Sequence, residues 1–433
     1  MKKCILHIGM NKTGSSSIQN YLTKFSNDLG EGVKYANLGS ANHSGAFSYI
    51  FVDNLLDIPT YKLRELTHTL VRKKSELFRK RLEFELNSDF KTIIFSAEEL
   101  AILTEKELQN LKNKLLNYVD EIKVVAYVRT PLSFMESAFQ QRVKVRVIEL
   151  DYKLLYPKYK VRFEKFEQIF GAVEYSLFEK KSLIGGDVIQ DFCNKQKVNF
   201  HQSLSSNISL SGIATKFLYL YQKARKEITI TQEKIEILES TLKNIEGDKF
   251  RFPQQYEKIM REEFDEDYIW MNSRIKFPHG SAIKDKKIQF DLKKFSREEY
   301  FELQKLTKID RFKKYFFKEC GVSIDTFLYN NFVNKINHHL EYKINISHVS
   351  SFAISGWVIN LNNVNEKIIL SIFINKIFVI QVKADQFRED LVANNLGNSS
   401  GHYAFKYKFE QKQSLGSSLD VLIDDVVVLS HIL

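Results

Sequence analysis

Two patterns of apolar and polar positions alternate along the first 200 residues. Short continuous apolar runs predict buried strands at residues 4–8, 33–35, 91–95, 123–128 and 173–178. Amphipathic segments separate these runs, and in the first one Ile18, Tyr21, Leu22 and Phe25 recur at the spacing of one helix face. Strands that alternate with helices in this way indicate a parallel sheet with helices on both faces. We therefore predict an α/β fold with a three-layer parallel sheet.

The pattern changes twice in the rest of the chain. Residues 205 to about 335 are rich in Lys, Glu, Leu and Phe and predict helices. From about residue 340 the pattern changes again, and apolar and polar positions alternate over 367–383 around Asn375-Lys376, as in a β-hairpin. Residues 352–359, 402–409 and 419–429 predict further strands. This end of the chain is expected to form a small all-β sandwich.

These changes suggest where the domains end. We predict a first domain over residues 1–275, with a core over 1–200 and a helical part over 201–275. A helical linker region would follow over 276–339, and the C-terminal β-sandwich domain would occupy 340–433.

Composition narrows the choice of partners. The chain has 433 residues and a formal net charge of +11, which favours a nucleotide, a nucleic acid, an anionic glycan or a membrane surface. A Lys-rich surface that serves only solubility is the alternative. The three cysteines are scattered, which argues for a reducing compartment. With no signal-peptide pattern and no long apolar run, we expect a cytoplasmic protein, and peripheral membrane attachment is left open.

A loop of small residues follows the first predicted strand, and a helix comes after it. Such a loop offers backbone N–H groups and the positive end of a helix to a phosphate. The ATP-binding loop has its Lys directly after the second Gly. Here Ser15 holds that position, and Lys12 lies two residues before Gly14, where it can reach the bridging oxygen of a phosphosulfate. An ordinary turn with a solvated Lys is the alternative. The loop reads His7-Ile8-Gly9-Met10-Asn11-Lys12-Thr13-Gly14-Ser15-Ser16-Ser17.

A second motif follows the strand predicted at 123–128. Arg129 emerges at the end of the strand, and Pro131 can occupy the first turn of a helix. Ser137 lies eight residues after Arg129, about two helical turns along. A guanidinium and a hydroxyl could together hold a second phosphate. Taken alone, a strand-end Arg paired with a surface carboxylate is the commoner explanation.

Together the two motifs resemble those of bacterial sulfotransferases that use 3′-phosphoadenosine 5′-phosphosulfate (PAPS). The resemblance covers about the first 270 residues, and it is weaker at Gly186-Asp187 and at Asn207-Ile208-Ser209-Leu210-Ser211. It implies a P-loop-like sulfotransferase fold, adenosine 3′,5′-bisphosphate as product and no required metal. It also implies that Lys12 stabilises the leaving phosphate, that 13–17 hold the 5′ end, and that Arg129 and Ser137 hold the 3′-phosphate. A kinase-like nucleotide enzyme is the alternative, disfavoured by the position of Lys12 and by the lack of an obvious magnesium Asp.

Sulfuryl transfer to a hydroxyl also needs a base. His43 follows the second predicted strand and has a side chain that titrates near neutrality. Glu98 follows the third predicted strand. Both positions resemble places where sulfotransferases keep a base, although a backbone-bonded loop His and a helix-terminal Glu capped by Ser96 would also fit. We prefer His43 and keep Glu98 as its partner or replacement.

The acceptor is expected to be a carbohydrate, such as a capsular polysaccharide or a lipopolysaccharide sugar. A basic, Tyr-containing segment follows the second motif and could cover a glycan, including an anionic one, although a solvated helix face is an equal alternative. No nucleic-acid-binding module is recognisable, and the pair His338-His339 is not expected to bind a metal. The basic residues of the segment are Arg142, Lys144, Arg146, Lys153, Lys158, Lys160, Arg162 and Lys165.

The C-terminal segment has a resemblance of its own. Ser355-Gly356-Trp357, residues 384–391 and residues 401–405 resemble a small β domain appended to bacterial glycan-modifying transferases. Glycan binding or oligomer formation through this domain is a hypothesis, as is association with the inner membrane or a glycosyltransferase. A noncatalytic glycan-binding protein remains an alternative function.

Overall fold

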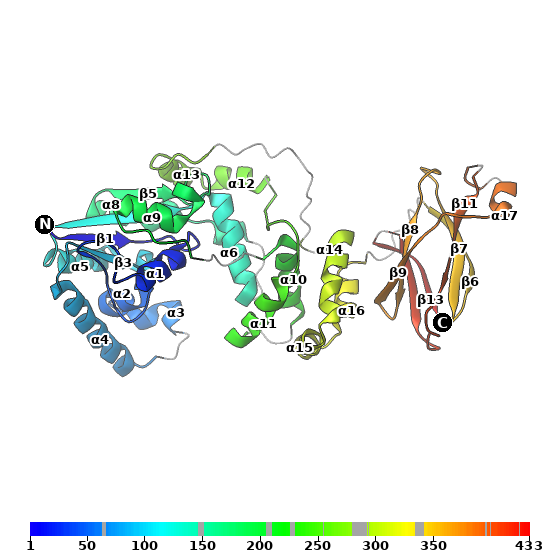
Figure 1. The fold of residues 1–433 in the computed structure, drawn as a ribbon, viewed down its shortest axis with the longest axis horizontal. Coiled ribbons are helices and arrows are strands. Elements are labelled where there is room, and N and C mark those ends of the chain that lie inside the picture. The colour runs from blue at the N-terminus through cyan, green and yellow to red at the C-terminus, as the bar shows by residue number, and fades with distance from the viewer. Residues whose placement is uncertain are drawn as a thin grey trace. The chain divides into compact units, whose positions relative to one another are not determined.

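The computed structural model forms two compact units (Figure 1). Unit 1 comprises Met1–Gln141, Leu150–Ile208 and Arg251–Ile288, and unit 2 comprises Arg142–Glu149, Ser209–Phe250 and Gln289–Leu433. The domain boundaries predicted at residues 275 and 339 fall inside these stretches and stay predictions. The structure describes residues 1–62, 66–145, 151–204, 210–225, 230–253, 255–278, 292, 294–333, 342–394, 396–398, 400–423 and 425–433.

Unit 1 is built on a five-stranded parallel sheet with the order β2-β3-β1-β4-β5. Each strand lies within two residues of a predicted apolar run, so the predicted parallel α/β sheet is confirmed. The central strand β1 pairs His7 with Ser96 on one side and with Val125 on the other. The strands are β1 (Lys3–His7), β2 (Val33–Tyr35), β3 (Thr92–Ser96), β4 (Glu121–Val128) and β5 (Val173–Leu177).

Helices cover both faces of this sheet. On one face Val125 and Tyr127 of β4 share a core with α1 (Ser15–Lys24) and α9 (Val188–Gln196). On the other face Tyr175, which pairs with Ala126, contacts Phe163 of α8. The remaining helices of the unit are α2 (Ser44–Phe51), η1 (Leu55–Asp57), α3 (Pro59–Lys62), α4 (His68–Asn87), η2 (Leu100–Ile102), α5 (Glu105–Leu116), α6 (Pro131–Val145), α7 (Tyr152–Leu155), α8 (Tyr159–Phe170), η3 (Ile184–Gly186), α12 (Gln255–Glu263) and α13 (Asp265–Asn272).

The strand order places two loops beside each other. The chain leaves β1 toward β2 at one edge of the sheet, whereas it leaves β4 toward β5 at the other edge. Adjacent parallel strands whose connections run in opposite directions leave a crevice at their carboxyl ends, and ligands of open α/β sheets bind there. The loops after β1 and β4 carry the two predicted anion-binding motifs, so the topology brings both motifs to this crevice.

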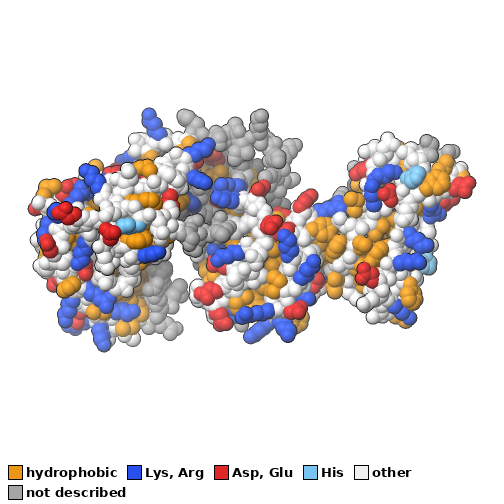
Figure 2. All heavy atoms as spheres, viewed as in Figure 1, with side chains coloured by type: hydrophobic (Ala, Val, Ile, Leu, Met, Phe, Trp, Pro, Cys, Tyr) orange, Lys and Arg blue, Asp and Glu red, His pale blue; other side chains and the backbone are white. Residues whose placement is uncertain are grey.

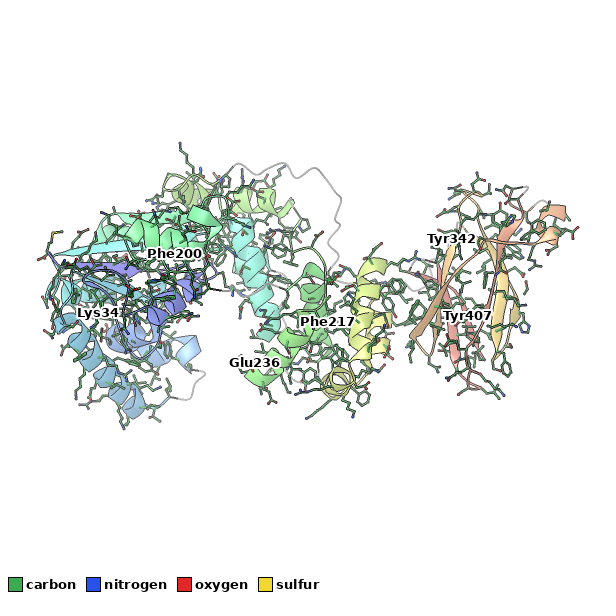
Figure 3. All side chains as sticks on the ribbon, in the orientation of Figure 1. Lys34, Phe200, Phe217, Glu236, Tyr342 and Tyr407 are labelled. Carbon is green, nitrogen blue, oxygen red and sulfur yellow. The ribbon has the colours of Figure 1, made fainter. Side chains whose placement is uncertain are left out.

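The helical part of unit 2 is organised around aromatic side chains. Phe217, labelled in Figure 3, lies among the rings of Tyr221, Phe312, Phe316 and Phe327. The predicted helical character of this region is confirmed. Its helices are α10 (Gly212–Ala224), α11 (Gln232–Leu242), α14 (Arg297–Leu303), η4 (Gln304–Lys308), α15 (Asp310–Cys320) and α16 (Ile324–Asn330). Within the described residues, no helix of the chain is long and apolar enough to cross a membrane.

Two antiparallel sheets form the C-terminal β region, in the orders β10-β11-β7-β6 and β13-β12-β8-β9. One apolar core joins them, which confirms a β-sandwich. The predicted hairpin turns at Asn375 and Lys376, which have φ of 50° and 65° as its tight turn requires. The strands are β6 (Tyr342–Val349), β7 (Ala353–Asn360), β8 (Ile369–Ile374), β9 (Ile377–Lys383), β10 (Gln386–Phe387), β11 (His402–Lys408), β12 (Ser418–Ile423) and β13 (Val426–Ile432), with the short helix α17 (Glu389–Ala393).

Two details of this region differ from the sequence-based expectation. The apolar run at 419–429 is not one strand but two, because β12 ends at Ile423 and β13 begins at Val426, and the two strands pair antiparallel. Strand β6 was not predicted, although its partly buried residues Tyr342, Ile344, Ile346 and Val349 are all apolar and alternate with exposed polar residues over most of its length.

The sheet β13-β12-β8-β9 packs against helices as well as against the other sheet. Phe373 of β8 contacts the rings of Tyr300 and Tyr329, which α14 and α16 contribute. The Tyr329 hydroxyl donates a 2.6 Å hydrogen bond to the buried carboxylate of Asp420, which also accepts one from Ser430. Burial on both faces explains why β8 and β12 are almost continuously apolar.

We predict that Asp420→Ala will destabilise unit 2 by about 1–3 kcal/mol, because the Tyr329 hydroxyl loses its buried acceptor. The midpoint of chemical denaturation measures this effect. Asp385→Ala, which removes a carboxylate with 43% of its side chain exposed, is the matched control and should change little. Equal midpoints for the two variants would contradict the assigned role of the Asp420 carboxylate.

Candidate functional site

The loop between β1 and α1 has an unusual backbone that the sequence supports only in part. Gly9, Lys12 and Gly14 have φ of 74°, 67° and 79°, all in the left-handed region. Two of these residues are glycine, but Lys12 is not, and a left-handed Lys costs of order 1 kcal/mol. The Met10 N–H donates to the Tyr127 carbonyl over 2.9 Å and ties the loop to β4. Strain of this kind at a loop end is typical of functional sites.

The loop leaves the beginning of α1 open. Gly14 is the N-cap, no side chain caps the helix, and its first turn contains no acidic residue. An uncapped helix start presents backbone N–H groups and positive potential, which suit a phosphate or sulfate. Only some of the predicted hydroxyl donors are available to a ligand. Thr13 and Ser15 are buried, and their hydroxyls donate to the Met10 carbonyl over 2.5 and 3.2 Å. Ser16 is exposed and Ser17 is half-buried at the open end.

Phe178 brings this loop and the second motif together. A Cβ atom at Gly14 would lie only 2.9 Å from Phe178 Cε2 and 2.8 Å from Val188 Cγ1, so only glycine fits there. The Arg129 Cζ atom lies 4.7 Å from the centroid of the same ring. The loop and Arg129 therefore pack against one aromatic side chain at the carboxyl end of the sheet.

Arg129 is a half-buried cation at the end of β4. Its Nε atom is buried without a hydrogen-bond partner, and within the described residues no acceptor bonds its guanidinium. Burial lowers the pKa of Arg129 to about 10, with Glu136 acting against the shift and Arg251 adding to it. Burying a charge without a hydrogen-bonded partner is costly. An anionic ligand at this position would remove that cost.

Helix α6 contributes the other predicted member of the second motif. Ser137 is half-buried, and in the part of the chain that the structure describes its hydroxyl has no hydrogen bond. One turn further along α6, Gln141 accepts a 2.9 Å hydrogen bond from the Lys12 ammonium. Lys12 thus reaches from the loop to the helix that carries Ser137. Lys12 and Arg129 are thus tied to α6 and Phe178 respectively, and the shared role of Lys12, Arg129 and Ser137 stays a prediction.

Glu98 also lies against the loop. Its Cβ would be 2.6 Å from a Cβ atom placed on Gly9, and its carboxylate accepts a long, 3.4 Å hydrogen bond from the Asn42 amide. Burial raises the pKa of Glu98, while the Ser15 hydroxyl and the positive charges of Lys12 and Arg162 act in the opposite direction. No helix begins at Glu98, so the helix-terminal alternative does not apply. A half-buried carboxylate with a raised pKa beside a cation is suited to accept a proton.

His43 has a different environment. The residue is fully buried, and its Nδ1 atom accepts a 3.2 Å hydrogen bond from the Ser96 N–H. The imidazole stacks on Tyr35 at 4.7 Å and meets Phe95 edge-on. Burial lowers the pKa of His43 to about 4, with the Ala36 backbone opposing the shift. The ring is therefore neutral near pH 7 and enclosed, and its catalytic role stays a prediction that this burial disfavours.

The structure adds site residues that the motifs did not include. Phe178 is the last residue of the strand predicted at 173–178 and directly follows the observed β5, and this strand-end position was the available signal. Arg251 lies far away in sequence, but it forms a 2.5 Å ion pair with Glu136 of α6 and acts electrostatically on Arg129. Arg162, one of the basic residues counted in 142–165, has a buried Nε without a partner and interacts with Glu98. Residues Arg146, Asn207–Ser209 and His338-His339 lie outside the described residues.

Known proteins resemble this chain only weakly. No family model matches it, and no curated protein matches it. A sulfotransferase domain from the curacin biosynthetic pathway is 14% identical over 60% of this chain and 97% of its own, with a TM-score of 0.27. A chain of the PezAT chromosomal toxin–antitoxin system of the human pathogen Streptococcus pneumoniae is 14% identical over 55% of this chain and 86% of its own, with a TM-score of 0.23. TM-scores this low establish neither fold nor function, so the chemistry rests on the residues of the site itself.

Proposed function

We propose that the protein is a sulfotransferase that moves the sulfuryl group of PAPS to a hydroxyl of a carbohydrate acceptor, such as a cell-surface polysaccharide or lipopolysaccharide sugar. The observation that carries the proposal is the Phe178 ring, which lies against both the open loop at Gly14 and the half-buried Arg129 guanidinium. Two anion-binding groups on one aromatic side chain suit a compact ligand with two separate anionic groups.

The donor set fits such a nucleotide. The free N–H groups at the start of α1 would hold the 5′-phosphosulfate, and Arg129 with Ser137 would hold the 3′-phosphate. When bound, PAPS supplies an activated sulfuryl group whose bond to the 5′-phosphate oxygen breaks as the acceptor oxygen attacks. Lys12, fixed between the loop and Gln141, would neutralise charge that develops on the leaving phosphate oxygen.

A carboxylate base completes the chemistry. Glu98 lies beside the loop, and burial favours its proton-bound form more than in water. It would take the proton of the acceptor hydroxyl while Lys12 acts at the leaving group. We therefore prefer Glu98 to the enclosed His43. The carbohydrate acceptor rests on the resemblance of the two motifs, and sulfate transfer from radiolabelled PAPS to polysaccharide and lipopolysaccharide fractions tests it directly.

The assignment of Arg129 predicts which nucleotide binds. Adenosine 3′,5′-bisphosphate should bind more tightly than adenosine 5′-monophosphate, and Arg129→Ala should reduce that preference by about tenfold or more because a charge-assisted contact is lost. Thermal shift and calorimetry measure this. Arg72→Ala, which alters an exposed ion pair on α4, is the control. Stabilisation by ATP with magnesium but not by the bisphosphate would instead favour the kinase-like alternative.

Lys12→Ala should lower kcat by about a hundredfold or more, because a preorganised charge opposite the leaving oxygen is removed. Its melting temperature without ligand should stay close to that of the wild type, since the residue is only half-buried. The exposed Lys24→Ala, in the last turn of α1, serves as the matched control. Full activity in Lys12→Ala would remove Lys12 from the mechanism.

Glu98→Gln should lower kcat by about a hundredfold or more, whereas Glu99→Gln, the exposed neighbour, should not. Because the base must be ionised and burial raises its pKa, the wild-type rate should fall as pH drops through a value above the ordinary Glu pKa of about 4.3. Rate–pH profiles measure this. A folded His43→Gln variant that loses activity while Glu98→Gln retains it would transfer the role to His43.

A further inference from the structure

Helix α4 (His68–Asn87) of unit 1 carries apolar side chains on a face that nothing in the described residues covers. Its packed face is formed by Val71, Phe78 and Leu82, and Phe78 contacts Tyr49 of α2 at a ring distance of 5.6 Å. On another face Leu70, Leu77 and Phe84 are 39%, 46% and 73% exposed. Isolated exposed apolar residues are common, so the arrangement of these three is what matters.

The three side chains form one stripe. They follow each other at intervals of seven residues, so each lies only about 20° around the helix from the last. We call Leu70, Leu77 and Phe84 the α4 stripe. It runs through four turns of the longest helix of unit 1, and its most exposed member is an aromatic ring.

Basic side chains flank the stripe on both sides. Lys73 and Lys80 lie along one side and Lys74 and Arg81 along the other, as the helical repeat requires. Lys74 lies over the Tyr49 ring, and Arg81 donates to the Leu38 carbonyl, so these two cations are held in place. Figure 2 shows basic and hydrophobic side chains gathered where Figure 1 draws α4.

The acidic residues of α4 are engaged elsewhere. Glu76 pairs with Arg72 at 3.2 Å, Glu83 with Lys114 at 2.7 Å and Glu85 with Lys34 at 2.9 Å. By contrast, no acidic partner of Lys73 or Lys80 is found among the described residues. The face that carries the stripe is therefore apolar at its centre and positive at its margins.

From these features we infer that the α4 stripe docks the protein on an anionic membrane surface. A helix with this pattern lies in the interface, with apolar side chains among the acyl chains and cations against lipid phosphates. Phe84 and the two Leu residues are side-chain types that are typical of the apolar face of such a helix. Packing against a second copy is disfavoured, because two such faces would oppose their basic rows. The inference does not depend on the proposed transfer reaction.

Vesicle co-sedimentation of the full chain tests the inference. The wild type should pellet with vesicles that contain about one third phosphatidylserine, but not with pure phosphatidylcholine, and salt should weaken binding. The double change Leu77→Ser with Phe84→Ser should lower the partition coefficient at least about tenfold, and Lys73→Gln with Lys80→Gln should do the same on anionic vesicles. Circular dichroism should show that both variants stay folded, since all four side chains are exposed.

The matched control is Leu415→Ser with Ile432→Ser, which removes two apolar side chains that are 85% and 71% exposed in the C-terminal β region. It should bind vesicles as the wild type does. Equal binding of the wild type to neutral and anionic vesicles, or full binding by the stripe variant, would overturn the inference. So would a concentration-dependent dimer in sedimentation velocity that the stripe variant abolishes, because the stripe would then be a contact between copies.

Discussion

The unpaired charge of Arg129 is the constraint around which the proposed site of unit 1 is organised. A half-buried guanidinium whose Nε atom is enclosed without an acceptor is unfavourable by itself, and the Phe178 ring compensates only part of the lost hydration. The same ring packs against Gly14, so the Arg129 guanidinium and the open start of α1 lie near each other. An anion that reaches both points would relieve the unfavourable charge and occupy the free N–H groups together.

The sheet order makes this arrangement possible. The connections from β1 and β4 diverge, which leaves space at the carboxyl ends of these neighbours. Glu98 enters the same space from β3, the strand on the other side of β1, and its carboxylate is held near the cation of Lys12. Lys12, the proposed cation at the leaving group, and Glu98, the proposed base, thus follow the adjacent strands β1 and β3. His43 is buried against the rings of Tyr35 and Phe95, and burial lowers its pKa, so the neutral imidazole is the stable form.

The basic residues that give the chain its net positive charge gather in more than one place in the structure. Part of it belongs to the crevice, where Lys12, Arg129, Arg162 and Arg251 act on one another or on nearby carboxylates. Another part lies along α4, where the acidic residues are paired and the outward cations border apolar side chains. Composition alone could not separate a nucleotide site from a surface for anionic lipids, because both need the same residue types.

The sequence by itself determined the parallel sheet, the β-sandwich and the two motifs, because period-two and helical patterns, glycine positions and a strand-end Arg are local properties. Tertiary structure alone decided the remaining points. Arg251 reaches the site from a distant segment, and Phe178 lies against both motifs. Burial also decided that His43 is enclosed while Glu98 lies beside the loop. Desolvation and long-range pairing depend on what surrounds a residue in space, and no local pattern records that.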